Sequence, residues 1–202
     1  QALARATQPA ARPADLLEAV DAPAGGGLEG RAERLRARLS GKGDGLGVRR
    51  GATGLSEEAV ERALRWLVAH QRDDGSWNFD HTKGLCQGLC RNPGTFASTT
   101  ASTAVALLPF LGAGYTHQEG EHREVVKRGF YYLSTRVRIT ADGIDLQEGS
   151  LYSQGLAAIA FCEVYAMTGD PAMKDLAQGA IDFIVHAQDK KGGGWRYRPA
   201  EP

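Results

Sequence analysis

Two stretches of the chain, at 62–77 and 179–195, have closely similar sequences, RALRWLVAHQRDDGSW and GAIDFIVHAQDKKGGGW. In each copy an apolar helical pattern runs into a glutamine, a glycine turn and a tryptophan. A third segment, KRGFYYLSTRVRITADG, repeats the helix but lacks the closing glutamine and tryptophan. Internal copies of this kind predict a fold built from stacked helical units, each contacting its neighbours.

The two copies share the glutamine, the glycine and the tryptophan of the turn, but not its charged residues. Asp73 and Asp74 in the first copy correspond to Lys190 and Lys191 in the second, so the carboxylates are not repeated. A glutamine at a helix end can bond backbone groups that are unpaired there, and an indole can cover the joint while burying apolar surface. We interpret the repeated residues as two clasps between helices and predict no catalytic residue. The clasp residues are Gln71, Gly75, Trp77, Gln188, Gly193 and Trp195.

Five helices of two alternating kinds are expected. Segments from Ser56 to about Gln71, from 121 to 135 and from 171 onward carry one apolar stripe each, the last through Ala177, Ala180, Ile181, Ile184 and Gln188. Segments 96–111 and 151–168 are small or apolar on nearly every side, so they must be surrounded by other elements. Only VRITADGIDL indicates a short hairpin. This alternation predicts an all-α fold, a partial α/α toroid of about two and a half helix pairs with outer and inner helices.

Composition changes along the chain divide it into three parts. The 202 residues contain 42% apolar and 24% charged residues, which is ordinary for a globular protein. Residues 1–30 are rich in Ala, Pro and Gly and are expected to form a flexible tether. Residues 31–54 are expected to form a short helix and linker, and residues 55–202 the toroid section.

The clasps resemble the QW motif of squalene-hopene cyclases, and the helix alternation resembles the α/α toroid that these cyclases share with protein prenyltransferase β-subunits. The resemblance covers about residues 55–197. It implies a repeat domain that handles a polyisoprenoid or another apolar ligand. It also implies a longer toroid, of about six helix pairs, so that a remainder beyond this chain is expected.

The chemistry of that family is not reproduced in these residues. The D-x-D-D motif that protonates substrate in the cyclases does not occur, and aromatic residues are few in the inner helices. Polar residues at the starts of the inner helices are the candidates for a ligand-binding cavity mouth, although they could equally cap helices. They are Ser98, Thr99, Ser102, Tyr152, Ser153 and Gln154. The alternative function is a non-catalytic, tethered toroid that binds a lipid or a protein partner.

The cysteines raise a separate question. Cys86 and Cys90 lie in a glycine-containing loop, where a local disulfide can form if the compartment is oxidising. The competing interpretation is a zinc site with His81 and both thiolates, whose fourth ligand would be His117 or His122. Two free thiols are the third alternative. Taken together, the alternatives lead us to predict no metal and no cofactor.

The balance of charge limits the classes of partner. Acidic and basic residues number 24 each, which indicates no nucleic-acid partner. No apolar run reaches the roughly 18 residues of a membrane span, so no transmembrane segment is expected. An extracytoplasmic or membrane-tethered location is slightly favoured by the tether.

Overall fold

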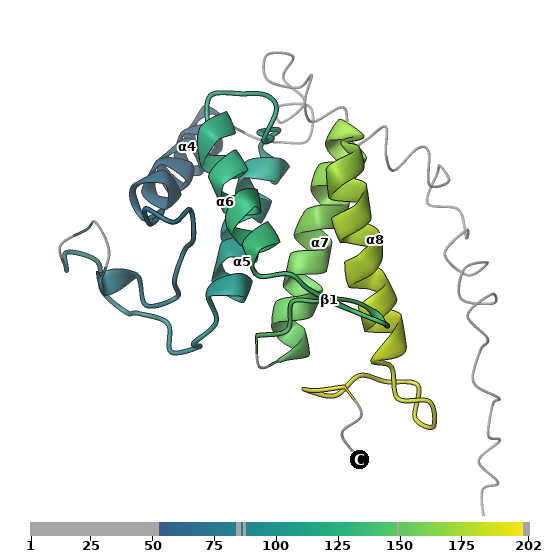
Figure 1. Ribbon diagram of the computed structural model, residues 1–202. Helices are drawn as coiled ribbons and strands as arrows, with labels where there is room; N and C mark the ends of the chain where they lie inside the picture. Colours follow the sequence, from purple (N-terminus) through teal and green to yellow (C-terminus); the bar gives the residue numbers. More distant parts are fainter. Residues whose placement is uncertain (1–52, 84–85, 87, 149, 200–202) are drawn as a thin grey trace, which may run out of the picture.

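A computed structural model describes residues 53–83, 86, 88–148 and 150–199 (Figure 1). The predicted tether, 1–30, and nearly all of the predicted linker, 31–54, lie outside these residues. In the described part the order of elements is α4 (Gly54–Ala69), η1 (His81–Lys83), α5 (Thr99–Gly112), α6 (Arg123–Thr135), β1 (Arg138–Thr140), β2 (Gly143–Asp145), α7 (Leu151–Thr168) and α8 (Pro171–His186). Helices dominate and the only pairing of strands described is the β1–β2 hairpin, so the all-α class is confirmed.

Helices α4 and α5 do not start where the sequence predicted, because the hydroxyl groups of Thr53 and Ser98 cap them at other positions. Thr53, not Ser56, caps α4, and Ser56 completes a capping box by bonding the Thr53 backbone. Helix α5 starts after Ser98, whose hydroxyl accepts from the Ala101 N–H, so Phe96 precedes the helix. Helix α7 has the predicted bounds, and α8 begins at Pro171 after the Asp170 cap as expected.

Helices α5 and α7 pack along each other and hold most of the buried core, whereas α4, α6 and α8 bury one face each. In Figure 1, α7 and α8 run side by side and the hairpin lies across α8. The predicted difference between the two kinds of helix is present in their burial, but α7 is not surrounded, because Tyr152 and Ile159 are more than half exposed. One stripe was wrong in detail, because α8 buries Phe183 while Ile181 remains 38% exposed. None of the described helices combines the length and apolarity needed to cross a membrane.

The first clasp joins the end of α4 to α6. The Gln71 carboxamide donates to the Gly75 carbonyl at 3.0 Å and to the Val125 carbonyl of α6 at 2.9 Å. The Trp77 indole N–H donates to the Leu67 carbonyl at 2.8 Å, and the ring is 3% exposed. One amide group thus closes the turn and fixes it to the next outer helix.

The second clasp repeats two bonds of the first, the glutamine bond that closes the turn and the indole bond to the helix. Gln188 donates to the Gly193 carbonyl at 2.6 Å, and the Trp195 indole donates to the Ile184 carbonyl at 2.8 Å. Ile184 precedes Gln188 by four residues, as Leu67 precedes Gln71. The interpretation of both copies as clasps agrees with this geometry. Their burial differs, however, because Trp195 is 52% exposed, whereas sequence reasoning expected both indoles to be covered.

The connection between α6 and α7 has no clasp glutamine in its turn. A glutamine of α7, Gln154, stabilises it instead. The hairpin takes the place of the turn, and Gln154 of α7 donates to the Ile144 carbonyl at 2.9 Å and to the Ala180 carbonyl of α8 at 3.0 Å. Each buried carboxamide therefore bonds one carbonyl of the connecting segment and one of the following outer helix. Gln154 therefore connects the hairpin to α8 in the way that Gln71 connects the first turn to α6.

We predict that the two tryptophans contribute unequally to stability. Trp77→Ala removes a buried indole and should lower the free energy of unfolding by about 3–5 kcal/mol. Trp195→Ala removes a half-exposed ring and should cost less than half as much. Chemical denaturation of the two variants measures both values, and equal losses would contradict this account of the clasps.

A matched pair of glycine variants separates backbone conformation from close packing. Gly75 and Gly193 both have positive φ, 88° and 71°. A Cβ at Gly75 would lie 2.4 Å from the Arg128 carbonyl oxygen, whereas a Cβ at Gly193 would meet nothing within 4 Å. Both alanine variants carry the same left-handed strain of about 1 kcal/mol. We expect Gly75→Ala to be less stable than Gly193→Ala by a further 1 kcal/mol or more, in order of magnitude. Similar denaturation midpoints would show that α6 can move away at no cost.

Candidate functional site

Four of the six residues predicted to line a cavity mouth are buried and bonded inside the protein. The Ser98 and Ser153 hydroxyls lie 2.9 Å apart and link the starts of α5 and α7. The Ser102 hydroxyl donates to the Trp77 carbonyl at 2.6 Å. Gln154 holds the second joint. The geometry gives these four residues structural partners, and their role in ligand binding remains a prediction.

Glu148 organises the start of α5. Its carboxylate accepts from the Ser98 hydroxyl at 2.9 Å, the Thr99 hydroxyl at 3.0 Å and the Thr100 N–H at 2.7 Å. Arg136 lies 3.4 Å away. Burial would raise the pKa of Glu148, but the hydrogen bonds from Thr100, Ser98 and Thr99 outweigh it and hold the pKa below 4.5. The carboxylate therefore serves as an anionic cap at a helix N-terminus.

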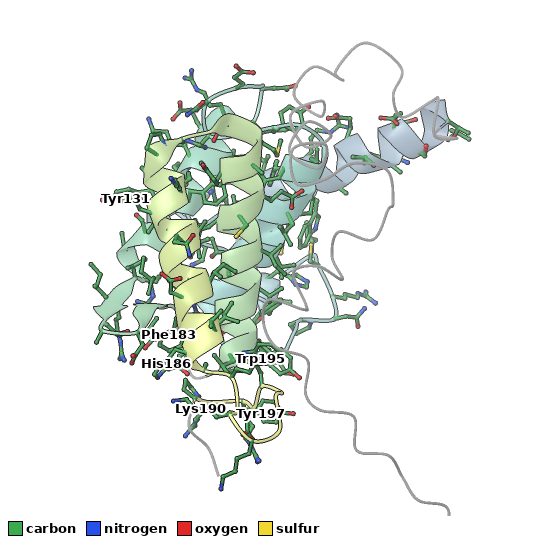
Figure 2. The ribbon with its side chains drawn as sticks, turned by 90° about the vertical axis from the view of Figure 1, so that its right-hand side faces the viewer. Tyr131, Phe183, His186, Lys190, Trp195 and Tyr197 are labelled. Atoms are coloured by element: carbon green, nitrogen blue, oxygen red, sulfur yellow. The ribbon has the colours of Figure 1, made fainter. Side chains whose placement is uncertain are left out.

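Tyr152, in contrast, faces an aromatic pocket. The pocket has a volume of about 360 Å³ and is lined by Leu151, Tyr152, Trp195, Arg196 and Tyr197. The Tyr152 and Tyr197 rings meet edge to face with their centroids 5.7 Å apart. Figure 2 shows Trp195 and Tyr197 in the segment that follows α8, beyond the end of that helix. The second clasp and the start of α7 thus build one wall each.

A second group of chemically active residues lies at the end of α4. His70, Cys86 and Cys90 place one nitrogen and two sulfurs within 4.8 Å of one another, and we call this set the thiol–imidazole cluster. The Cys90 Sγ lies 3.5 Å from the His70 Nε2. His70 is buried, while both cysteines are half-buried. Solvent therefore reaches the sulfurs but hardly the imidazole.

The surroundings of His70 determine which nitrogen faces the sulfurs. Its Nδ1 lies 2.6 Å from the Trp66 carbonyl, which can only accept, so Nδ1 carries the proton. The Nε2 lone pair is then directed at Cys90. Trp66 stacks on His70 with ring centroids 3.9 Å apart, and its indole N–H donates to the Cys90 Sγ at 3.3 Å. The imidazole is held in one orientation from two sides.

The thiol of Cys86 is unusually acidic. Its pKa is lowered to about 6, chiefly by the Cys90 backbone N–H, with a smaller contribution from the Gly88 N–H. Above that pH the group is mainly thiolate, the form that acts as a nucleophile or a metal ligand. Cys162, in α7, shows the opposite behaviour, because burial raises the pKa of its thiol.

Sequence reasoning chose the wrong histidines for these cysteines. The ring nitrogens of His81 lie 3.2 Å from the Phe79 and Arg91 carbonyls and are directed away from the sulfurs. His117 pairs with Asp170 at 2.7 Å, and His122 packs against Tyr115. His70 was missed because it lies inside the repeated motif. The signal that could have found it is a difference between the copies, since His70 corresponds to Ala187.

Cys86 and Cys90 are both free thiols in the structure. A disulfide between them remains a prediction for an oxidising compartment. Comparisons with protein-family models, with curated proteins and with solved structures find no match to this chain.

We predict that Glu148→Gln destabilises the protein by about 1–2 kcal/mol at neutral pH, since it removes the anion at the α5 N-terminus. Because the folded pKa is depressed, this contribution is present above about pH 4.5 and is lost as the pH falls through the lower folded value. Denaturation at pH 7 and pH 3 should show the difference shrinking. The exposed Glu121→Gln variant is the control, and a difference that is independent of pH would contradict the assignment.

Proposed function

We propose that this chain forms a section of an α/α toroid of the squalene-cyclase and prenyltransferase type, and that it binds an isoprenoid or similarly apolar ligand without catalysing its protonation. The aromatic pocket formed by Tyr152, Trp195 and Tyr197 is the observation that carries the ligand-binding part. The toroid part follows from the repeated clasps and from the alternation of inner and outer helices.

The inner helices support this proposal through their uncovered faces. Val105 of α5 is 38% exposed and Ile159 of α7 is 52% exposed, although most apolar residues of both helices are buried or half-buried. Leu156 and Cys162 continue the α7 stripe and are half-buried. In a ring of helix pairs, such stripes would face the interior, where an apolar ligand would meet them.

The pocket itself has suitable chemistry for such a ligand. Three aromatic rings offer apolar surface and negative π-faces, and the Trp195 indole N–H is already bonded to a carbonyl. Tyr152, Trp195 and Tyr197 are each more than half exposed. Burying this surface against a hydrocarbon would therefore be favourable.

Three aspartates that could be considered as proton donors, Asp74, Asp142 and Asp145, are engaged in structural interactions. Asp74 accepts from the Ser76 hydroxyl at 2.6 Å and from its N–H at 3.0 Å. Burial alone would raise the pKa of Asp74, but these bonds and Arg72 lower it, so it is a poor proton donor. Asp145 pairs with Arg138 at 2.8 Å and Asp142 lies 3.2 Å from His186. These carboxylates therefore provide no acid for protonating a bound isoprenoid, which favours binding without reaction.

A second candidate function, docking of a protein partner, is favoured by one observation. Val185, Trp195 and Tyr197 are large apolar residues at the same end of α8, exposed by 63%, 52% and 66%. Large apolar residues that gather on a surface are common at interaction sites. Binding of small isoprenoids distinguishes the two functions, because a docking surface has no need for them.

The test is titration of the full chain with squalene in micelles and with farnesyl diphosphate, followed by tryptophan fluorescence. Tyr152→Ala and Tyr197→Ala should each weaken binding about tenfold, the effect of losing roughly 1.4 kcal/mol of apolar contact. Tyr131→Ala is the matched control, because Tyr131 is 69% exposed and lies far from the pocket in Figure 2. Mass spectrometry should recover both compounds unchanged. If the wild type binds neither compound, the isoprenoid proposal is wrong, and a new product would contradict binding without reaction.

A further inference from the structure

We propose that His70, Cys86 and Cys90 form a zinc-binding site with three protein ligands and one position open to water. The proposal does not depend on the isoprenoid function, because the thiol–imidazole cluster and the aromatic pocket share no residue. Two sulfurs and one imidazole nitrogen are donors that zinc prefers, and three protein ligands with an open fourth position are typical of catalytic zinc sites.

The spacing of the donor atoms fits a single ion. Zinc binds sulfur at about 2.3 Å and nitrogen at about 2.0–2.1 Å, so two tetrahedral ligand atoms lie about 3.5–3.8 Å apart. The Cys90 Sγ and His70 Nε2 lie 3.5 Å apart, and all three donors are within 4.8 Å of one another. Small side-chain rotations would bring the widest pair into this range.

The imidazole is prepared for metal binding before any ion arrives. The Trp66 carbonyl accepts from Nδ1 at 2.6 Å, which leaves the Nε2 lone pair directed at the sulfurs. Hydrogen bonding at the far nitrogen is the usual way in which a protein orients a histidine ligand. Stacking by Trp66 restricts rotation of the ring further. The stretch from 66 to 70 is the last turn of α4 and its cap, so the ligand stands on a rigid element.

The two cysteines complete the site from the loop side. They lie four residues apart, and the Leu89 N–H donates to the Cys86 carbonyl at 2.9 Å, which turns the chain between them. Both are half-buried, so an ion and a water molecule can reach the sulfurs. Every cysteine and histidine of the chain lies in its described part, and Cys162, His117, His122 and His186 are outside the cluster.

The site also explains features that the clasp does not need. The second clasp has Ala187 where the first has His70, and it still forms the glutamine bond that closes the turn and the indole bond to the helix. The clasp therefore requires neither the imidazole nor its orientation by Trp66. A buried histidine beside two thiols has a clear use in metal binding.

Zinc binding to the reduced full chain, followed by competition with a chromophoric chelator, tests the proposal. We expect one zinc per chain, and cobalt in its place should give thiolate-to-cobalt charge-transfer absorption and intense tetrahedral d–d bands. His70→Gln, Cys86→Ser and Cys90→Ser should each weaken zinc binding at least about tenfold, the lower bound seen when even an outer partner is lost. Circular dichroism of each variant checks that the helices remain folded.

Two variants serve as matched controls. His81→Gln removes the histidine that lies near the loop but bonds carbonyls, and Cys162→Ser removes the remaining thiol. Both should bind zinc as the wild type does. The proposal is overturned if the reduced wild type binds no zinc, if His81→Gln weakens binding as much as His70→Gln, or if Cys162→Ser abolishes it.

Discussion

The described domain depends on a repeated device in which one carboxamide bonds two main-chain carbonyls. Gln71 connects its own turn to α6, and Gln154 connects the hairpin to α8. Carbonyls at helix ends and in buried turns lose water when the helices pack, so each must find a donor in the protein. Because an amide nitrogen has two hydrogens, it can satisfy a carbonyl on each side of the joint. Helices α6 and α8 are thereby attached to the turn and the hairpin that pack against them.

The aromatic part of the device differs between joints in a way that follows from packing. Trp77 is buried because α6 crosses it closely, with Gly129 at the contact: a Cβ there would lie 3.0 Å from the ring. Trp195 forms the same bond to its helix but remains half exposed, and its free face lines the aromatic pocket. The same local motif thus acts as core in one place and as a wall of a pocket in another.

The thiol–imidazole cluster exploits the rigidity of the first clasp. His70 directly precedes Gln71, so the amide that fixes the end of α4 also fixes the imidazole. The chain then runs through Trp77 and returns to the helix at Cys86 and Cys90, which brings the sulfurs back to the same helix end. A site assembled from a helix cap and a returning loop needs this closure, since the loop alone has little buried surface to hold it.

The sequence by itself determined the local elements and the joints. Periodicity, the Asp170 cap and the hairpin pattern predicted the bounds of α7, the start of α8 and the place of the hairpin, because these signals act over a few neighbouring positions. Comparison of the two copies identified the clasps and excluded Asp73 and Asp74 from them. Only the tertiary structure decided which side chains are buried and which lie close to one another. It turned Gln154 and Ser153 inward, exposed Trp195, and chose His70 rather than His81 for the cysteines. Side-chain burial and donor proximity depend on how distant elements cross, which the spacing along a chain does not specify.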